Sequence, residues 1–125
     1  MIKHQFQPSA KSCGQTCLAM LLGVPVAQVI ADMPDRAATR VGQLCAYLVL
    51  RGWTATKLQR IRGLITQPAI IRVVWPGRST RAIGHWILFA DGNLFDPTSP
   101  NNLEWMVTGG RLTSYIALAP PERAR

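Results

Sequence analysis

The first half of the chain has the hydrophobic pattern of helices. Residues 13–22 are apolar almost all round and stop at Gly23, which predicts a buried helix with a glycine just past its end. Pro25 favours the start of a second short helix that runs to Met33. A third helix is expected to begin at Thr39 or Arg40 and to stop before Gly52. Its apolar stripe, with spacings of three and four residues, consists of Val41, Leu44, Cys45, Leu48 and Val49.

The second half has the pattern of strands. Alternation, β-branched residues or a long apolar run predict strands over residues 53–58, 69–75, 83–90 and 112–118. Asp91 and Gly92, between Ala90 and Asn93, are a strong signal for a two-residue hairpin loop. Helices packed on a C-terminal antiparallel sheet make an α+β domain.

Length and composition fit one such domain. The 125 residues are 48% hydrophobic, which allows a single core. We expect residues 1–118 to form the domain and the Pro- and charge-rich residues 119–125 to be a flexible basic tail. No apolar run has the length of a membrane span, and the first residues lack the apolar stretch of a signal peptide. These features favour a cytoplasmic protein.

The chain is strongly basic, but its charge is scattered. Fourteen Lys and Arg against six Asp and Glu give a net charge of +8. Nucleic-acid-binding proteins usually concentrate such charge on one helix or groove with interleaved aromatic residues, and this chain has no such stripe. The charge therefore favours anionic partners, such as an acidic peptide or protein, and nucleic acid stays an alternative.

The cysteines offer one candidate nucleophile. An odd number of them, without Cys-x-x-Cys spacing, argues against a disulfide framework and against a zinc site. Cys17 and Cys45 fit apolar positions. Cys13 lies at the predicted start of a helix, where free backbone N–H groups and the helix dipole favour a thiolate over a thiol. Gly14 follows it and is expected to leave the sulfur open to an approaching carbonyl.

His85 and Asp96 are expected to meet across the predicted hairpin. Period two places His85 on the same strand face as Ile87. If Asp91 and Gly92 form a two-residue loop, Ile87 pairs with Asp96, which becomes the diagonal neighbour of His85. A carboxylate there can accept from one imidazole nitrogen and leave the other for a nucleophile. A three-residue loop would turn Asp96 away, which leaves the alternatives of a core histidine and a turn-forming Asp-Pro.

Two segments resemble a known family. Gln7, followed six residues later by the run 13–22, resembles the N-terminal signature of the bacteriocin-leader peptidases, papain-like domains that process double-glycine leaders on ABC exporters. Residues 84–88 followed by 94–97 resemble the histidine strand and aspartate turn of that family. The resemblance implies a papain-like cysteine peptidase, with Cys13 as nucleophile, His85 as general base and acid, Asp96 as orienting carboxylate and Gln7 as oxyanion donor.

Acyl transfer requires such a set: an activated nucleophile, an oriented base and a donor for the developing oxyanion. We therefore expect a hydrolase that cleaves a peptide or related amide through a thioester on Cys13, without a metal or an organic cofactor. Two alternatives stay open. The same site could cleave an isopeptide or transfer the acyl group to an amine, or the chain could be a basic binding protein without turnover.

Two further features have competing interpretations. Gly109-Gly110 resembles the family's cleavage sequence, but its position just before a predicted strand favours a hairpin turn. Trp75, Trp86 and Trp105 could line a substrate groove, although such aromatic residues more often belong to a core.

Overall fold

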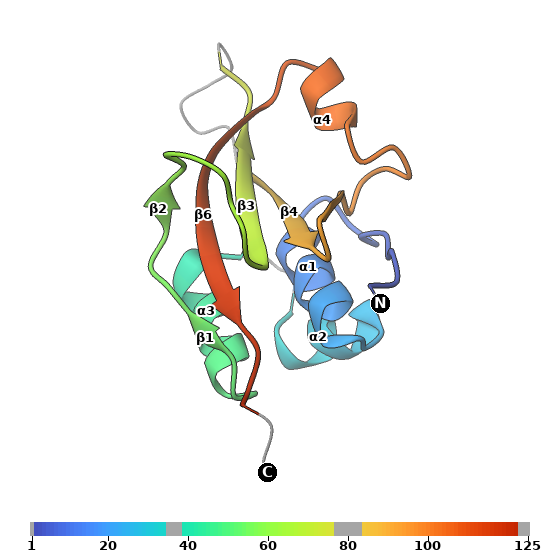
Figure 1. The fold of residues 1–125 in the computed structure, drawn as a ribbon. Helices are drawn as coiled ribbons and strands as arrows, with labels where there is room; N and C mark the ends of the chain where they lie inside the picture. Colours follow the sequence, from blue (N-terminus) through green and yellow to red (C-terminus); the bar gives the residue numbers. More distant parts are fainter. Residues whose placement is uncertain (1, 35–38, 77–83, 123–125) are drawn as a thin grey trace.

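The α+β architecture expected from the sequence is observed in the computed structural model, which describes residues 2–34, 39–76 and 84–122 (Figure 1). Three helices come first: α1 (Cys13–Leu22), α2 (Val26–Asp32) and α3 (Val41–Val49). The strands follow as β1 (Thr54–Ala55), β2 (Gln59–Arg60), β3 (Ala69–Val74), β4 (His85–Ala90), β5 (Asn93–Phe95) and β6 (Arg111–Ala119), with the short helix α4 (Glu104–Val107) before β6.

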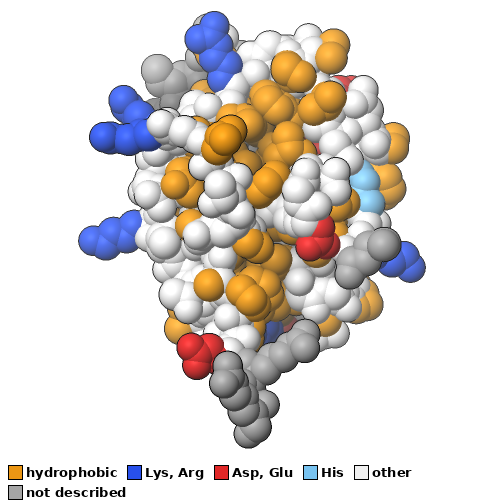
Figure 2. Space-filling view, in the orientation of Figure 1, with side chains coloured by type: hydrophobic (Ala, Val, Ile, Leu, Met, Phe, Trp, Pro, Cys, Tyr) orange, Lys and Arg blue, Asp and Glu red, His pale blue; other side chains and the backbone are white. Residues whose placement is uncertain are grey.

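The strands form one antiparallel sheet with α1, α2 and α3 on one face. Its order is β1-β6-β3-β4-β5, and β2 pairs with the same long strand β6. The main core fills the space between helices and sheet and includes Leu18, Leu48 and Leu88. The opposite face carries a second apolar cluster around Ile71 and Ile87. Figure 2 shows apolar side chains running down this second face, which looks away from the helices.

Helix α1 is the buried helix that the sequence predicts. It ends at Gly23, whose φ of 70° is the left-handed conformation in which a glycine carries no steric cost. Gly14 has a packing role that the sequence did not indicate. A Cβ at this position would collide with the Thr39 side chain and press on Leu44, so the missing side chain allows α1 to pack against the start of α3.

The β4–β5 hairpin has the register expected from the sequence. Asp91 and Gly92 have φ values of 53° and 75°, and two consecutive positive values define the type I′ turn that suits a two-residue loop. The partners are Ala90 with Asn93, Phe89 with Leu94, and Leu88 with Phe95. The predicted register is therefore confirmed, while Ile83, at the expected start of the strand, lies outside the described residues.

Several local predictions need correction. The single strand expected over 53–58 is replaced by two short strands, because β1 and β2 pair with different parts of β6. Val49 is 58% exposed and does not belong to the buried stripe of α3. Gly109-Gly110 ends helix α4 instead of turning a hairpin, with the Gly110 N–H donating to Trp105 O. Ala119 pairs with Thr54, so β6 takes one residue that was assigned to the tail.

Among the described helices, none alone has both the length and the apolar composition to cross a membrane. Helices α1 and α2 pass that test only as a pair, and they are bent by 118° relative to each other.

Candidate active site

Asp96 is the most firmly held residue of the site. It follows β5 directly and is only 1% exposed. Its Oδ1 accepts hydrogen bonds from His85 Nε2 at 2.7 Å, from Thr98 N at 2.9 Å and from Thr98 Oγ1 at 2.7 Å. Its backbone N–H donates to Asn102 Oδ1, and its carbonyl oxygen is 2.7 Å from His4 Nε2. Asp96 therefore forms the Asp-Pro turn and also faces His85. The two roles that the sequence offered for Asp96, a turn residue and the partner of His85, are compatible.

His85 begins β4, with its side chain mostly buried at 11% exposure. Burial by itself disfavours the charged ring and lowers its pKa. The hydrogen bonds to Asp96 and Cys13, with the negative charges of both partners, outweigh burial and raise the pKa of His85 to about 9. Burial by itself raises the pKa of Asp96, but the hydrogen bonds from His85 and Thr98, with the positive charge of His85, outweigh burial and lower it. This arrangement keeps an imidazolium beside a carboxylate at neutral pH.

Cys13 is the first residue of α1, and its side chain is one of the groups that raise the pKa of His85. Because Nε2 of the ring is engaged by Asp96, Nδ1 is the nitrogen left for the sulfur. Cys13 is 5% exposed, so the residue is largely buried at the start of the helix. As the first helical residue, it has a backbone N–H without an intrahelical acceptor.

The other two thiols lack these features. Cys17 is completely buried, and burial raises the pKa of its thiol well above the ordinary value, with the negative charges of Cys13 and Asp96 adding to the effect. Burial also raises the pKa of Cys45, whose sulfur lies 3.7 Å from Thr56 O. Both thiols are therefore poor nucleophiles at neutral pH, because the thiolate is the reactive form.

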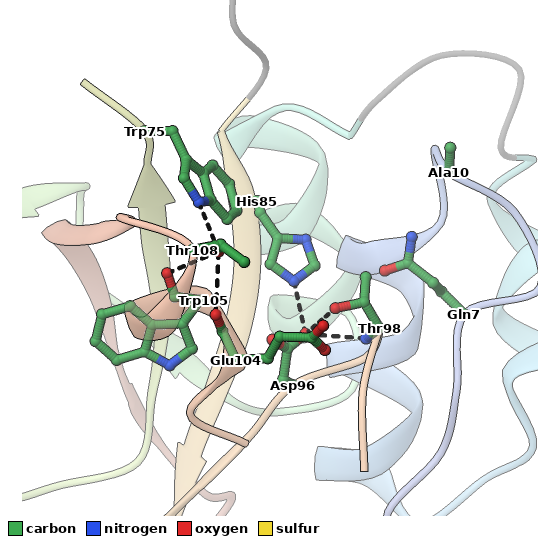
Figure 3. Close-up of a pocket in the computed structure, with 9 residues that line it drawn as sticks. All are labelled: Gln7, Ala10, Trp75, His85, Asp96, Thr98, Glu104, Trp105 and Thr108. Carbon is green, nitrogen blue, oxygen red and sulfur yellow. Dashed lines mark hydrogen bonds and ion pairs between the residues drawn. The ribbon is translucent and has the colours of Figure 1, made fainter. Parts of the chain in front are cut away.

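Gln7 is brought to the site by the N-terminal segment. Its backbone N–H donates to Pro97 O at 2.9 Å, which ties it to the turn that carries Asp96. Its Nε2 donates to Ser9 O at 2.9 Å, and its Oε1 is buried without a hydrogen-bond partner among the described residues. Figure 3 shows this oxygen on the side of His85. The oxyanion role therefore requires the second N–H of Nε2 or a rotation of the amide.

These residues border a pocket of about 470 Å³ (Figure 3). Its described lining consists of Gln7, Ala10, Trp75, His85, Asp96, Thr98, Glu104, Trp105 and Thr108. Of the three tryptophans considered from the sequence, Trp75 and Trp105 thus line the pocket, whereas Trp86 belongs to the main core. Cys13 is not among the described residues of the lining.

The chain matches no known protein-family model and no curated protein. The resemblance to bacteriocin-leader peptidases therefore stays a prediction, and the geometry of the site has to carry the functional argument.

Sequence reasoning missed several residues of the site. Thr98 had a usable signal, since a Thr two residues after an Asp-Pro turn commonly bonds back to the carboxylate. His4, Asn102 and Glu104 had none, because their roles depend on how the N-terminal segment and α4 pack around Asp96 and the pocket.

Proposed function

We propose that this chain is a papain-like cysteine hydrolase, which cleaves a peptide or related amide through a thioester on Cys13. One observation carries the proposal: the imidazole of His85 donates from Nε2 to the buried carboxylate of Asp96 at 2.7 Å, and Cys13, at the start of α1, is among the groups that raise its pKa. Supporting it are the nucleophile at a helix N-terminus, the histidine on a strand of the sheet and the resemblance of both segments to the leader peptidases.

The chemistry follows from the charge state of His85. With its pKa at about 9, the ring carries a proton at neutral pH and stabilises a thiolate on Cys13. The sulfur attacks the amide carbon, a C–S bond forms, and the carbonyl electrons move to oxygen. The backbone N–H of Cys13 and the amide of Gln7 donate to that oxyanion.

In the remaining steps, His85 first donates a proton and then accepts one. His85 gives its proton to the leaving nitrogen as the C–N bond breaks, and a thioester remains on Cys13. Water then attacks the thioester while His85 accepts one of its protons. The C–S bond breaks, the carboxylic acid leaves, and Cys13 returns as a thiolate. Replacement of this water by an amine gives the acyl-transfer alternative, and an isopeptide bond would follow the same steps.

A thiol-specific alkylating probe tests the proposal. We expect stoichiometric labelling of Cys13 at neutral pH with Cys17 and Cys45 unlabelled, located by mass spectrometry of the digested protein. A slow, equal reaction of all three thiols would contradict an activated nucleophile. Salt-dependent binding of nucleic acid that is unchanged in Cys13→Ala would favour the alternative of a basic binding protein.

A further inference from the structure

The pocket continues past His85 on the side away from Gln7. In Figure 3, Gln7 and Ala10 lie on one side of the imidazole, and Trp75, Trp105 and Glu104 lie on the other. Within the proposed function, the oxyanion forms near Gln7, and the leaving nitrogen must be within reach of His85 to take its proton. The part of the substrate on the amine side of the scissile bond therefore extends toward Trp75, Trp105 and Glu104.

The two indoles at this end of the pocket are fixed in place. Trp75 Nε1 donates to Thr108 Oγ1 at 3.1 Å, and Trp105 Nε1 donates to Asn102 O at 3.0 Å. A side chain at Gly110 would collide with Trp105 O and press on the Trp75 ring, so the glycine keeps both in position. Trp105 is only 9% exposed and packs in the second apolar cluster, whereas the half-buried Trp75, with its N–H bonded elsewhere, offers apolar surface and a π-face, which attracts cations.

Glu104 adds a negative charge that no Lys or Arg among the described lining residues balances. Of the charged groups among the described lining residues, Asp96 is paired with His85, and no Lys or Arg is present. The ion pairs within the described ranges are Arg51–Asp32 and His85–Asp96, so Glu104 pairs with no described cation. The chain as a whole has a net charge of +8 and attracts anions. The acidic end of the pocket differs from the rest of the protein, because its negative charge attracts cations.

We propose that this end of the pocket binds a lysine or arginine side chain, on the residue directly after the scissile amide. Its aliphatic stem would lie along the indole of Trp75, and its charged head would reach the Glu104 carboxylate. The inference rests on the proposed function, because the proton transfer from His85 sets the direction in which the substrate lies. It assigns Glu104 to specificity, with no part in the chemical steps.

Cleavage of a randomised synthetic peptide mixture tests this specificity. The new N-termini produced by the wild type are sequenced and compared with those from Glu104→Gln and Glu104→Lys. We expect roughly twofold to fivefold enrichment of Lys and Arg after the cut, the range of an exposed charge pair together with a cation–π contact. The enrichment should vanish in Glu104→Gln and turn toward Asp and Glu in Glu104→Lys.

Glu122→Gln is the matched control, because it removes the same charge from the C-terminal segment, at the end of the molecule opposite α4 (Figure 1). It should keep the wild-type profile. Equal profiles in wild type and Glu104→Gln would overturn the inference and leave the proposed function standing. If the protein shows no cleavage activity that is lost in Cys13→Ala, the result would instead count against the proposed function.

A substrate-independent measurement separates the two claims. Cys13 is treated with (2-aminoethyl) and with (2-sulfonatoethyl) methanethiosulfonate, which have opposite charges. In both cases the thiolate attacks the sulfenyl sulfur, a disulfide forms and methanesulfinate leaves. The rate of Cys13 modification by the cationic reagent, divided by the rate with the anionic reagent, should fall at least twofold in Glu104→Gln and should not change in Glu122→Gln. An unchanged ratio overturns the inference, and a Cys13 that reacts with neither reagent overturns both proposals.

Discussion

His85 Nε2 and Asp96 Oδ1 are 2.7 Å apart, across a hairpin that separates the two residues by eleven positions in the chain. The short loop makes this contact rigid, because Asp91 and Gly92 fix the register of β4 and β5. Thr98 and Asn102 hold Asp96 from the following turn. The imidazole is thereby oriented with one nitrogen on the carboxylate and the other available to Cys13.

Asp96→Asn should weaken the charged form of His85 while it preserves the shape of the site. The carboxylate is a main cause of the raised pKa, so the histidine of the variant should titrate closer to its ordinary value of 6.5 than to 9. Proton NMR of the ring measures this shift directly. The rate of alkylation of Cys13 near neutral pH should fall, and hydrolysis should fall by at least roughly tenfold. Identical alkylation profiles against pH in both proteins would mean that Asp96 does not control His85.

The stability of the fold should depend on pH through His85. Its pKa is raised from 6.5 to about 9 in the folded chain, so the folded state binds more protons than the unfolded state between these values. The stabilisation is complete below about pH 6.5 and is lost as the pH rises through 9. The free energy of unfolding in urea should decrease by on the order of a few kcal/mol across that window. His85→Gln should remove most of this dependence; an equal slope in the variant would assign it to other groups.

Gln7→Ala should reduce the catalytic rate constant by roughly 10²–10³, the usual effect of losing one oxyanion donor. Gln7→Glu should be at least as damaging, because it places a negative charge where another is forming. The folding free energy should change little, since the side chain has one hydrogen bond, to Ser9 O. Unchanged kinetics in Gln7→Ala would show that the amide does not turn toward the oxyanion.

Gly14→Ala should destabilise the fold without a direct effect on the chemistry. The added methyl group would collide with the Thr39 side chain, and overpacking of this kind costs about 1–3 kcal/mol. Chemical denaturation measures the loss. The double variant Gly14→Ala, Thr39→Ala tests the cause, since loss of the colliding Thr39 Oγ1 should recover part of the stability. If the double variant recovers nothing, the close packing of α1 on the start of α3 is not what requires a glycine here.

Most of the site could be predicted from the sequence because it depends on local rules. The Asp91-Gly92 loop sets the register, and the register brings Asp96 to His85. The start of α1 places Cys13 at a helix N-terminus. The packing role of Gly14 was missed because it depends on Thr39 and Leu44, which are distant in sequence. Glu104 was missed because helix α4 has only four residues, too few for a periodic pattern to show.

Detection of a thioester on Cys13 tests the central claim most directly. The protein is mixed with the peptide substrates found in the cleavage assay, quenched in acid within milliseconds and digested, and the peptide containing Cys13 is weighed by mass spectrometry. We predict a mass increase equal to the acyl part of the substrate, which neutral hydroxylamine removes and which is absent in Cys13→Ala. Cleavage that proceeds in Cys13→Ala at the wild-type rate, with no acyl adduct in either protein, would contradict the account.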